Sequence, residues 1–129
     1  DYPFLVGRAD RVLVDPPCSA LGVLPKLYDL KSAKELASLA EYQRQFLKVA
    51  AKLVRPGGVV VYSVCTMTAR ECEGAVAFAV EQLGLEVEEQ PLYLASRGLP
   101  GRVEGAELLQ RFHPHLHGVG YFIARLRRP

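Results

Sequence analysis

Two cysteines stand where the sequence could perform nucleophilic chemistry. Cys18 ends the run Asp15-Pro16-Pro17-Cys18, Cys65 lies in Ser63-Val64-Cys65-Thr66, and each run continues a short apolar, β-branched stretch. A thiolate is a strong nucleophile, and a helix N-terminus after Cys65 would favour the ionised form there. A single free cysteine is more often a small buried apolar residue, so each position alone leaves both interpretations open. Two cysteines at the ends of consecutive strands favour a shared reactive site.

Asp15 is the third candidate, because it ends the first apolar run directly before two prolines. Neither proline can donate a backbone hydrogen bond, so the strand must stop there and the carboxylate must stand at the rim of the sheet. The alternative is a proline-terminated strand with an incidental acidic residue. We expect a carboxylate that faces the same site as the two thiols.

The other reactive residue types carry weaker signals. His113, His115 and His117 alternate, so in an extended segment they would face one way and could bind a metal. Pro114 between them and the lack of a fourth ligand argue against this, and we expect no metal site. Cys72 falls on the apolar stripe of a predicted helix and is expected in the core. The chain has no Walker loop, no Ser-His-Asp order and no zinc-finger spacing.

The elements that would position these residues alternate between strands and helices. Continuous apolar runs predict buried strands, and apolar residues at helical spacing predict helices. We expect a strand at 11–15, a helix at 32–54 ended by residues 55–58, a strand at 59–64, a helix opened by a capping box at 68–71, an edge strand at 85–88, an irregular segment at 89–118 and a last strand at 119–126. Two successive strand–helix units predict an α/β fold with a parallel sheet, whose chemistry lies beyond the carboxyl ends of its strands.

Composition narrows the class of protein. The chain has 129 residues, of which 50% are hydrophobic and 23% charged, a composition typical of a globular domain. Three cysteines are an odd number and lie in apolar segments, which predicts reduced thiols in a cytoplasmic protein. No apolar run approaches the ~18 residues that a membrane span needs. Residues 111–129 carry four arginines and no acidic residue, which is compatible with nucleic acid as a partner.

Residues 15–22 and 62–66 together resemble the paired signature of the NOL1/NOP2/Sun family of S-adenosylmethionine-dependent RNA cytosine-C5 methyltransferases. Further segments that resemble the family are the Gln43-containing helix, Val54-Arg55-Pro56-Gly57-Gly58, Glu71-Cys72-Glu73 and Gly120-Tyr121-Phe122-Ile123-Ala124-Arg125. The resemblance covers nearly the whole chain. It implies the C-terminal half of a Rossmann-like methyltransferase sheet, with parallel strands, helices and a final antiparallel strand. It also implies S-adenosylmethionine as cofactor and tRNA or rRNA as partner.

The resemblance implies a role for each matched position. Cys65 resembles the nucleophile that attacks C6 of cytosine, and Cys18 resembles the second cysteine, which assists release of the product. Asp15 resembles the carboxylate that touches the cofactor region and helps activate the base. Spacing alone would not choose between the two cysteines, because DNA cytosine-C5 methyltransferases carry their nucleophile in a Pro-Cys motif like Pro17-Cys18.

The resemblance also implies that residues 1–129 are a partial catalytic domain that lacks the N-terminal cofactor-binding strands and is inactive alone. The strand at 12–15 would then expose an apolar edge, which we expect to be covered by the missing N-terminal half or by a second copy of the chain. Two alternatives stay open. One is an amino-group nucleic-acid methyltransferase, and the other is a non-enzymatic half-domain that binds RNA or a partner chain.

Overall fold

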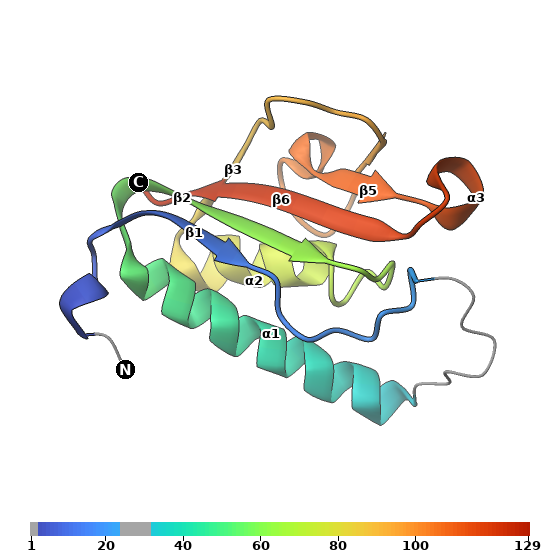
Figure 1. The fold of residues 1–129 in the computed structure, drawn as a ribbon, viewed down its shortest axis with the longest axis horizontal. Helices are drawn as coiled ribbons and strands as arrows, with labels where there is room; N and C mark the ends of the chain where they lie inside the picture. The colour runs from blue at the N-terminus through green and yellow to red at the C-terminus, as the bar shows by residue number, and fades with distance from the viewer. Residues whose placement is uncertain (1–2, 24–31) are drawn as a thin grey trace.

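The computed structural model describes residues 3–23 and 32–129, which form one six-stranded sheet with helices (Figure 1). The strands follow the order β1-β2-β6-β5-β4, and β3 pairs with β6. The strands are β1 Ala9–Val14, β2 Val54–Val64, β3 Glu86–Glu88, β4 Ser96–Arg97, β5 Gln110–Phe112 and β6 Tyr121–Arg127; the helices are η1 Pro3–Leu5, α1 Ala33–Leu53, α2 Glu73–Leu83, η2 Ala106–Leu108 and α3 Pro114–His117. β1 and β2 are parallel, whereas β6 runs antiparallel to β2. The predicted α/β class with a final antiparallel strand is confirmed.

α1 has the extent that its periodicity predicts. Ser32 caps the first turn by accepting a hydrogen bond from the Glu35 backbone, and the Glu35 side chain accepts from the Ser32 backbone. This reciprocal pair satisfies two donors that the first turn of a helix leaves free. One face of α1 is buried against the sheet and comprises Ala40, Gln43, Leu47 and Ala50.

β2 starts earlier than predicted. Residues 55–58 are not a turn that precedes the strand, because β2 begins at Val54, directly after α1. The register shifts here: Ala9 pairs with Val54, yet Arg11 pairs with Val59, so the β2 side holds extra residues. Gly57 takes φ +78°, and a side chain in place of Gly58 would meet the Asp10 carbonyl oxygen at 2.8 Å. The two glycines therefore make a bulge at the start of β2.

The capping box predicted for the second helix is wrong. α2 begins at Glu73, after a turn at residues 69–72, and its N-cap residue Cys72 makes no side-chain capping bond. The Glu71 N–H does donate to the Thr68 hydroxyl at 3.4 Å, but the buried Glu71 carboxylate accepts from the Thr68 hydroxyl and from other segments, not from the Thr68 backbone. The predicted apolar stripe is largely confirmed, since Cys72, Ala75, Val76 and Ala79 are buried.

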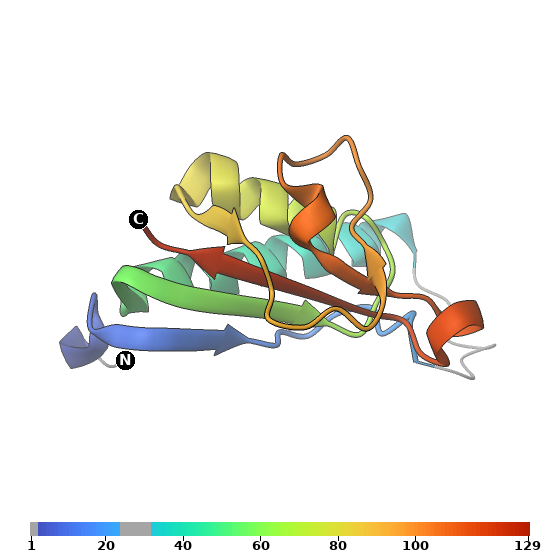
Figure 2. The ribbon, with the colours of Figure 1, turned by 90° about the horizontal axis from the view of Figure 1, so that it is seen from above.

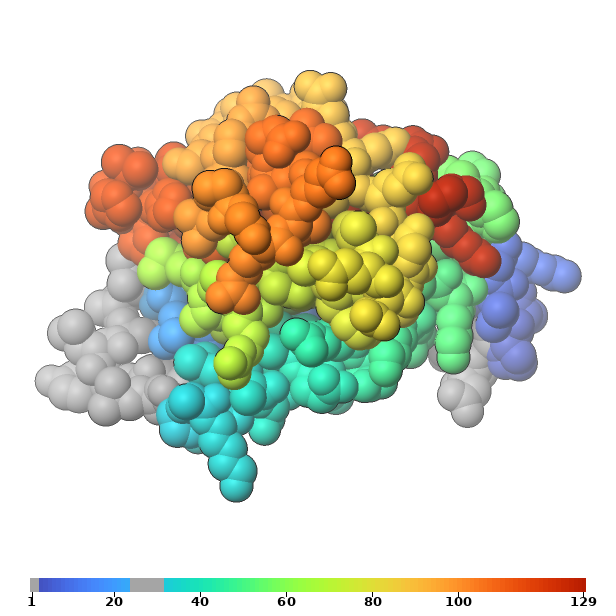
Figure 3. All heavy atoms as spheres, turned by 180° about the vertical axis from the view of Figure 1, so that it is seen from behind, coloured from blue at the N-terminus to red at the C-terminus, as the bar shows by residue number. Residues whose placement is uncertain are grey.

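The segment predicted as irregular at 89–118 contains short elements, namely β4, η2, β5 and α3. β3 lies within the predicted edge strand at 85–88 and pairs with the C-terminal part of β6, whose N-terminal part pairs with β5. α1 and α2 lie side by side on one face of the sheet (Figures 2 and 3). The core forms between them and the sheet, and its largest fully buried side chains include Tyr62 and Phe122.

β1 is the outermost strand, and no described strand pairs with its outer edge. Leu13 is 72% exposed there, and Phe46 and Val49 of α1 are exposed beside it. A shallow groove of about 410 Å³ runs along this edge, lined by Val12, Leu13, Val14, Asp15, Phe46, Val49, Ala50 and Leu53. An open apolar strand edge is a template on which another chain can pair. Within the described residues, no helix has the length and apolar character needed to cross a membrane.

A buried ion pair ties α2 to β5. Arg111 donates to both carboxylate oxygens of Glu73, and its Nη1 donates to the Met67 carbonyl at 2.7 Å. The side chains of Arg111 and Glu73 are 3% and 0% exposed. Sequence reasoning did not identify this pair, whose members lie 38 residues apart.

We expect Arg111→Ala to lower the free energy of unfolding by about 3–5 kcal/mol, because it leaves the Glu73 carboxylate buried without its partner. Urea denaturation of the chain measures this. Arg125→Ala is the matched control, since Arg125 pairs with Glu88 at 3.1 Å with 33% of its side chain exposed. We expect the control to lose about 0–1 kcal/mol. Equal losses in the two variants would contradict the assignment of Arg111 as a structural anchor.

Candidate active site

The two predicted cysteines meet at the carboxyl end of β1 and β2. Cys65 is the first residue after β2, and Cys18 lies four residues beyond the end of β1. Their sulfur atoms are 3.3 Å apart, and both residues are partly exposed. The prediction that the two sulfurs converge is therefore confirmed. A small reactant that arrives from solvent can therefore reach both thiols at once.

The Cys18 thiol is a weaker acid than an ordinary cysteine. Burial, together with the hydrogen bond to Cys65, raises the pKa of the Cys18 thiol to about 11. Cys18 therefore keeps its proton at neutral pH and can donate it in the contact with the Cys65 sulfur. A protonated thiol is a poor nucleophile, so this environment suits Cys18 to a role as a hydrogen-bond donor.

The loop that carries Cys18 is fastened to its surroundings by backbone contacts. The Gly22 N–H donates to the Cys65 carbonyl at 3.0 Å, and the Gly120 N–H donates to the Gly22 carbonyl at 2.8 Å. A Cβ atom on Gly22 would lie 2.1 Å from the Gly120 carbonyl oxygen, so only glycine fits this approach. Ala20 takes the left-handed conformation, with φ 57°. The chain thus folds tightly back over the end of β2.

Asp15 stands at the same rim of the sheet, as predicted. Its side chain is exposed, and the Ser63 hydroxyl approaches its Oδ1 at 3.5 Å. A carboxylate with free acceptor capacity can bind hydroxyl, amino or amide donors of a small molecule. The chemistry of Asp15 therefore fits a contact with a polar cofactor or base, although a single side chain does not make a pocket.

A buried carboxylate that sequence reasoning missed lies beneath the cysteine pair. Glu71 is 0% exposed and accepts hydrogen bonds from Ser19, Gln43, Thr66 and Thr68. The Tyr62 hydroxyl also donates to the Glu71 backbone carbonyl at 2.7 Å. The one available signal was the acidic motif Glu71-Cys72-Glu73, which does not say where either carboxylate points.

Comparison with known proteins identifies the family. The model of the family described as 16S rRNA methyltransferase RsmB/F matches residues 3–127. The chain belongs to this family. Its members are S-adenosylmethionine-dependent methyltransferases, and the relatives of this chain include RNA cytosine-C5 methyltransferases, as the resemblance to the NOL1/NOP2/Sun family predicted.

Individual relatives cover the chain almost completely. A tRNA (cytosine(72)-C(5))-methyltransferase from Pyrococcus horikoshii is 44% identical over 98% of this chain and 31% of its own length. The rRNA (cytosine-C(5))-methyltransferase NOP2C from Arabidopsis thaliana is 38% identical over 90% of this chain and 22% of its own length. The crystal structure of NSun6 from Pyrococcus horikoshii with SFG superposes with a TM-score of 0.79 at 45% identity, over 90% of this chain and 29% of that one. The chain thus spans about a third of these relatives or less.

The three histidines of this RsmB/F-family chain do not form the extended row considered from the sequence. Residues 114–117 are the short helix α3, and the His113 N–H donates to Nδ1 of His117 at 2.9 Å. Burial and the nearby Arg111 charge lower the pKa of His113. Among the described residues, no group of three His, Cys, Asp or Glu side chains is arranged to hold a metal ion.

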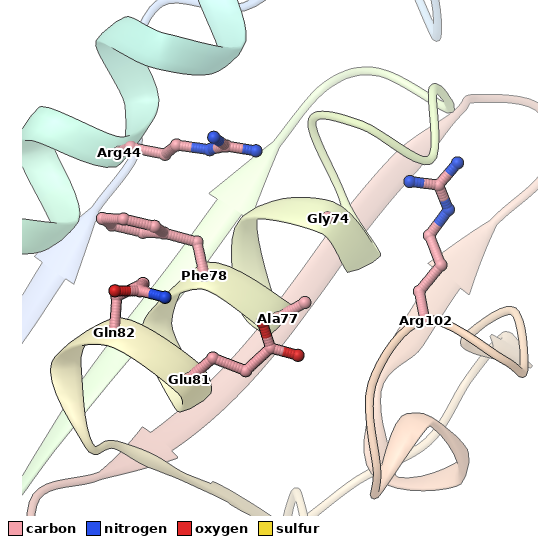
Figure 4. A pocket seen from close by; sticks show the side chains of 7 residues that line it. All are labelled: Arg44, Gly74, Ala77, Phe78, Glu81, Gln82 and Arg102. Carbon is pink, nitrogen blue, oxygen red and sulfur yellow. The ribbon is translucent and has the colours of Figure 1, made fainter.

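A second cavity of this family member, with no cysteine in its lining, lies beside α2 (Figure 4). It is a groove of about 500 Å³ lined by Arg44, Gly74, Ala77, Phe78, Glu81, Gln82 and Arg102. The Arg44 guanidinium lies 5.4 Å from the centre of the Phe78 ring. Because no reactive side chain lines the groove, the candidate active site remains the cysteine pair.

Proposed function

We propose that this chain is the C-terminal catalytic segment of an S-adenosylmethionine-dependent RNA cytosine-C5 methyltransferase that works through a covalent cysteine–cytosine adduct. The observation that carries the proposal is the 3.3 Å contact between Cys18 and Cys65 at the carboxyl ends of two parallel strands. Such strand ends are where α/β proteins place their chemistry. Methyl transfer to an exocyclic amino group needs no thiol nucleophile, so the cysteine pair argues against an amino-group methyltransferase.

Cys65 is the proposed nucleophile. C5 of cytosine is a poor nucleophile until C6 is saturated, so covalent attack at C6 divides one difficult step into easier ones. The Cys65 sulfur forms a bond to C6, and C5 then takes the methyl group that the cofactor supplies. A base from solvent takes the C5 proton, the electrons of that C–H bond form the C5–C6 double bond, and the Cys65 sulfur leaves C6 as a thiolate. Since Cys18 keeps its proton, it is suited to donate a hydrogen bond to the departing sulfur.

The target base must leave its stack to reach the thiols, because neither C5 nor C6 is accessible to a thiol inside a stacked helix. The relatives act on tRNA or on rRNA, and we propose an RNA of one of these two classes as substrate. The experiment is methyl transfer by the full-length protein to unmodified tRNA and rRNA transcripts, with 5-methylcytosine mapped by sequencing. Methylation of neither RNA, or of exocyclic amines instead of C5, would contradict the proposal.

We further propose that most of the cofactor site lies in sequence upstream of these residues, with Asp15 contributing from the sheet rim. The superposed NSun6 structure contains SFG, an analogue of S-adenosylmethionine, and the present chain matches 29% of it. Calorimetry is expected to give a dissociation constant weaker than about 1 mM for residues 1–129 and a micromolar one for the full-length protein. Micromolar binding by residues 1–129 alone would contradict this division of the site.

The open edge of β1 is the proposed contact for that upstream half. Leu13, Phe46 and Val49 form an exposed apolar strip along it, and burying such side chains is favourable. We expect residues 1–129 to self-associate in light scattering and the full-length protein to be monomeric. Leu13→Asp should abolish the self-association. If residues 1–129 stay monomeric at high concentration, the proposal that another segment covers the outer edge of β1 is contradicted.

A further inference from the structure

The two residues that follow the cysteines share one partner. Ser19 comes directly after Cys18 and Thr66 directly after Cys65, and their hydroxyl oxygens lie 2.7 Å apart. The Ser19 hydroxyl donates to Oε2 of Glu71 at 2.7 Å, and the Thr66 hydroxyl lies 3.1 Å from the same oxygen. The loop after β1 and the turn after β2 therefore meet at one carboxylate, one residue away from each sulfur.

Glu71 is held as an ionised acceptor. Its Oε1 accepts from the Ser19 backbone N–H at 2.8 Å and from Gln43 Nε2 at 3.0 Å, while the Thr68 hydroxyl donates to Oε2 at 2.5 Å. Burial raises the pKa of Glu71, but the hydrogen bonds from Thr68, Ser19 and Gln43 outweigh it, so the pKa lies below its ordinary value. Hydrogen bonds to an ionised acceptor are stronger than neutral ones, and a buried network of them is rigid.

The same network fixes the backbone on both sides of Cys18. Gln43 Nε2 donates to the Pro17 carbonyl at 3.1 Å as well as to Glu71, and the N–H on the other side, that of Ser19, is bound by Glu71. Gln43 belongs to the buried face of α1. Glu71 thus holds the backbone on both sides of Cys18, through Ser19 on one side and through Gln43 of α1 on the other.

We propose that Glu71 is a positioning residue that holds the Cys18 loop and the Cys65 turn in register, so that the two thiols stay in contact. No hydrogen bond joins its carboxylate to either sulfur, so it acts through Ser19 and Thr66. An effect of Glu71 on catalysis rests on the proposed function. Its effect on the distance between the two thiols does not depend on that function. Catalytic groups must keep their mutual geometry closely, and the network provides the support that such groups need.

Glu73 shows that burial alone does not explain this arrangement. It is the other fully buried acid of the same motif, yet its partner is Arg111 and its carboxylate makes no hydrogen bond with Ser19 or Thr66. Both carboxylates stabilise the fold, but only Glu71 joins the loops that carry the thiols. Glu73→Gln is therefore a matched control for Glu71→Gln.

The test measures how readily the two sulfurs meet. Diamide takes up the two thiol hydrogens as one Sγ–Sγ bond forms between Cys18 and Cys65, and peptide mass spectrometry identifies the bridge. We expect Glu71→Gln to slow this intramolecular bridging roughly tenfold or more, since a displacement of about 1 Å costs much of the advantage of proximity. Glu73→Gln should keep the rate within about twofold while lowering the melting temperature.

Thr66→Val covers the case in which Glu71→Gln does not fold. It keeps the shape and the carboxylate but removes the hydroxyl that joins the Cys65 turn to Glu71, and we expect slower bridging in a folded protein. A folded Glu71→Gln or Thr66→Val variant that bridges as fast as the unmodified chain overturns the proposal. So does equal slowing by Glu73→Gln, because the effect would then follow stability alone.

The full-length protein separates this inference from the proposed function. If both hold, Glu71→Gln lowers kcat for methyl transfer with little change in KM for RNA, since no described contact directs Glu71 to solvent or substrate. If the unmodified protein methylates no cytosine while the bridging rates follow the expected order, the proposed function fails and the positioning role stands. Bridging that is insensitive to Glu71 refutes the positioning role whatever the activity.

Discussion

Cys65→Ala in the full-length protein is expected to abolish the covalent complex with RNA that contains 5-fluorocytosine. The fluorine at C5 cannot leave as a proton does, so an enzyme that attacks C6 stays attached to this base in denaturant. Alanine has no nucleophilic group, so the slower band of a covalent protein–RNA complex should not appear on a denaturing gel. Methyl transfer to ordinary RNA should fall by roughly 10³-fold or more, the scale on which removal of a covalent nucleophile acts.

Cys72→Ala is the control for this experiment. Cys72 is the third cysteine and is 0% exposed in the core, where burial, the largest contribution, raises the pKa of its thiol. The control should keep the adduct and lose only stability. Peptide mapping of the unmodified protein should find the base on Cys65. A persistent adduct in Cys65→Ala, or a base mapped to another residue, would refute the assignment.

Local patterns were sufficient to predict the main elements and the meeting of the two cysteines. α1 follows from helical spacing, and β1 and β2 follow from continuous apolar runs. Once these strands were taken as parallel neighbours, Cys18 and Cys65 had to lie at the same end of the sheet, where the structure places them 3.3 Å apart. The choice of Cys65 over Cys18 as nucleophile comes from the family resemblance and stays a prediction.

The support beneath the cysteines could not be predicted, because its bonds join residues far apart in the chain. Glu71 binds Ser19 across 52 positions and Gln43 across 28. Its spacing from Thr68 predicts a helix cap, and the two residues do bond to each other, but α2 begins only at Glu73 and the Glu71 carboxylate also binds distant loops. Arg111 was counted as part of a basic end, whereas its ion pair with Glu73 places it in the interior. Charge patterns show neither burial nor partner.

Cys18→Ala is expected to give the opposite phenotype to Cys65→Ala: the adduct forms on ordinary cytosine and takes the methyl group, but it resolves slowly. In the proposed mechanism the Cys65 sulfur departs as a thiolate, and the adjacent Cys18 thiol, with its pKa raised to about 11 by burial and by the bond to Cys65, keeps a proton that would stabilise it. Removing such a donor typically costs about 10²–10⁴-fold in rate. Multiple-turnover methylation should fall accordingly, whereas a single turnover should still consume one equivalent of methyl donor.

Two further variants test the roles of Cys18 and Cys65. Cys18→Ala combined with Cys65→Ala should form no adduct, because resolution matters only after attack. Cys18→Ser tests the proton itself, since a hydroxyl donates a hydrogen bond from nearly the same position, and it should recover part of the turnover lost in Cys18→Ala. If Cys18→Ala forms no adduct while Cys65→Ala accumulates one, the two roles are exchanged. Cys18 would then ionise when RNA binds and attack C6, and Cys65 would donate the hydrogen bond to the Cys18 sulfur.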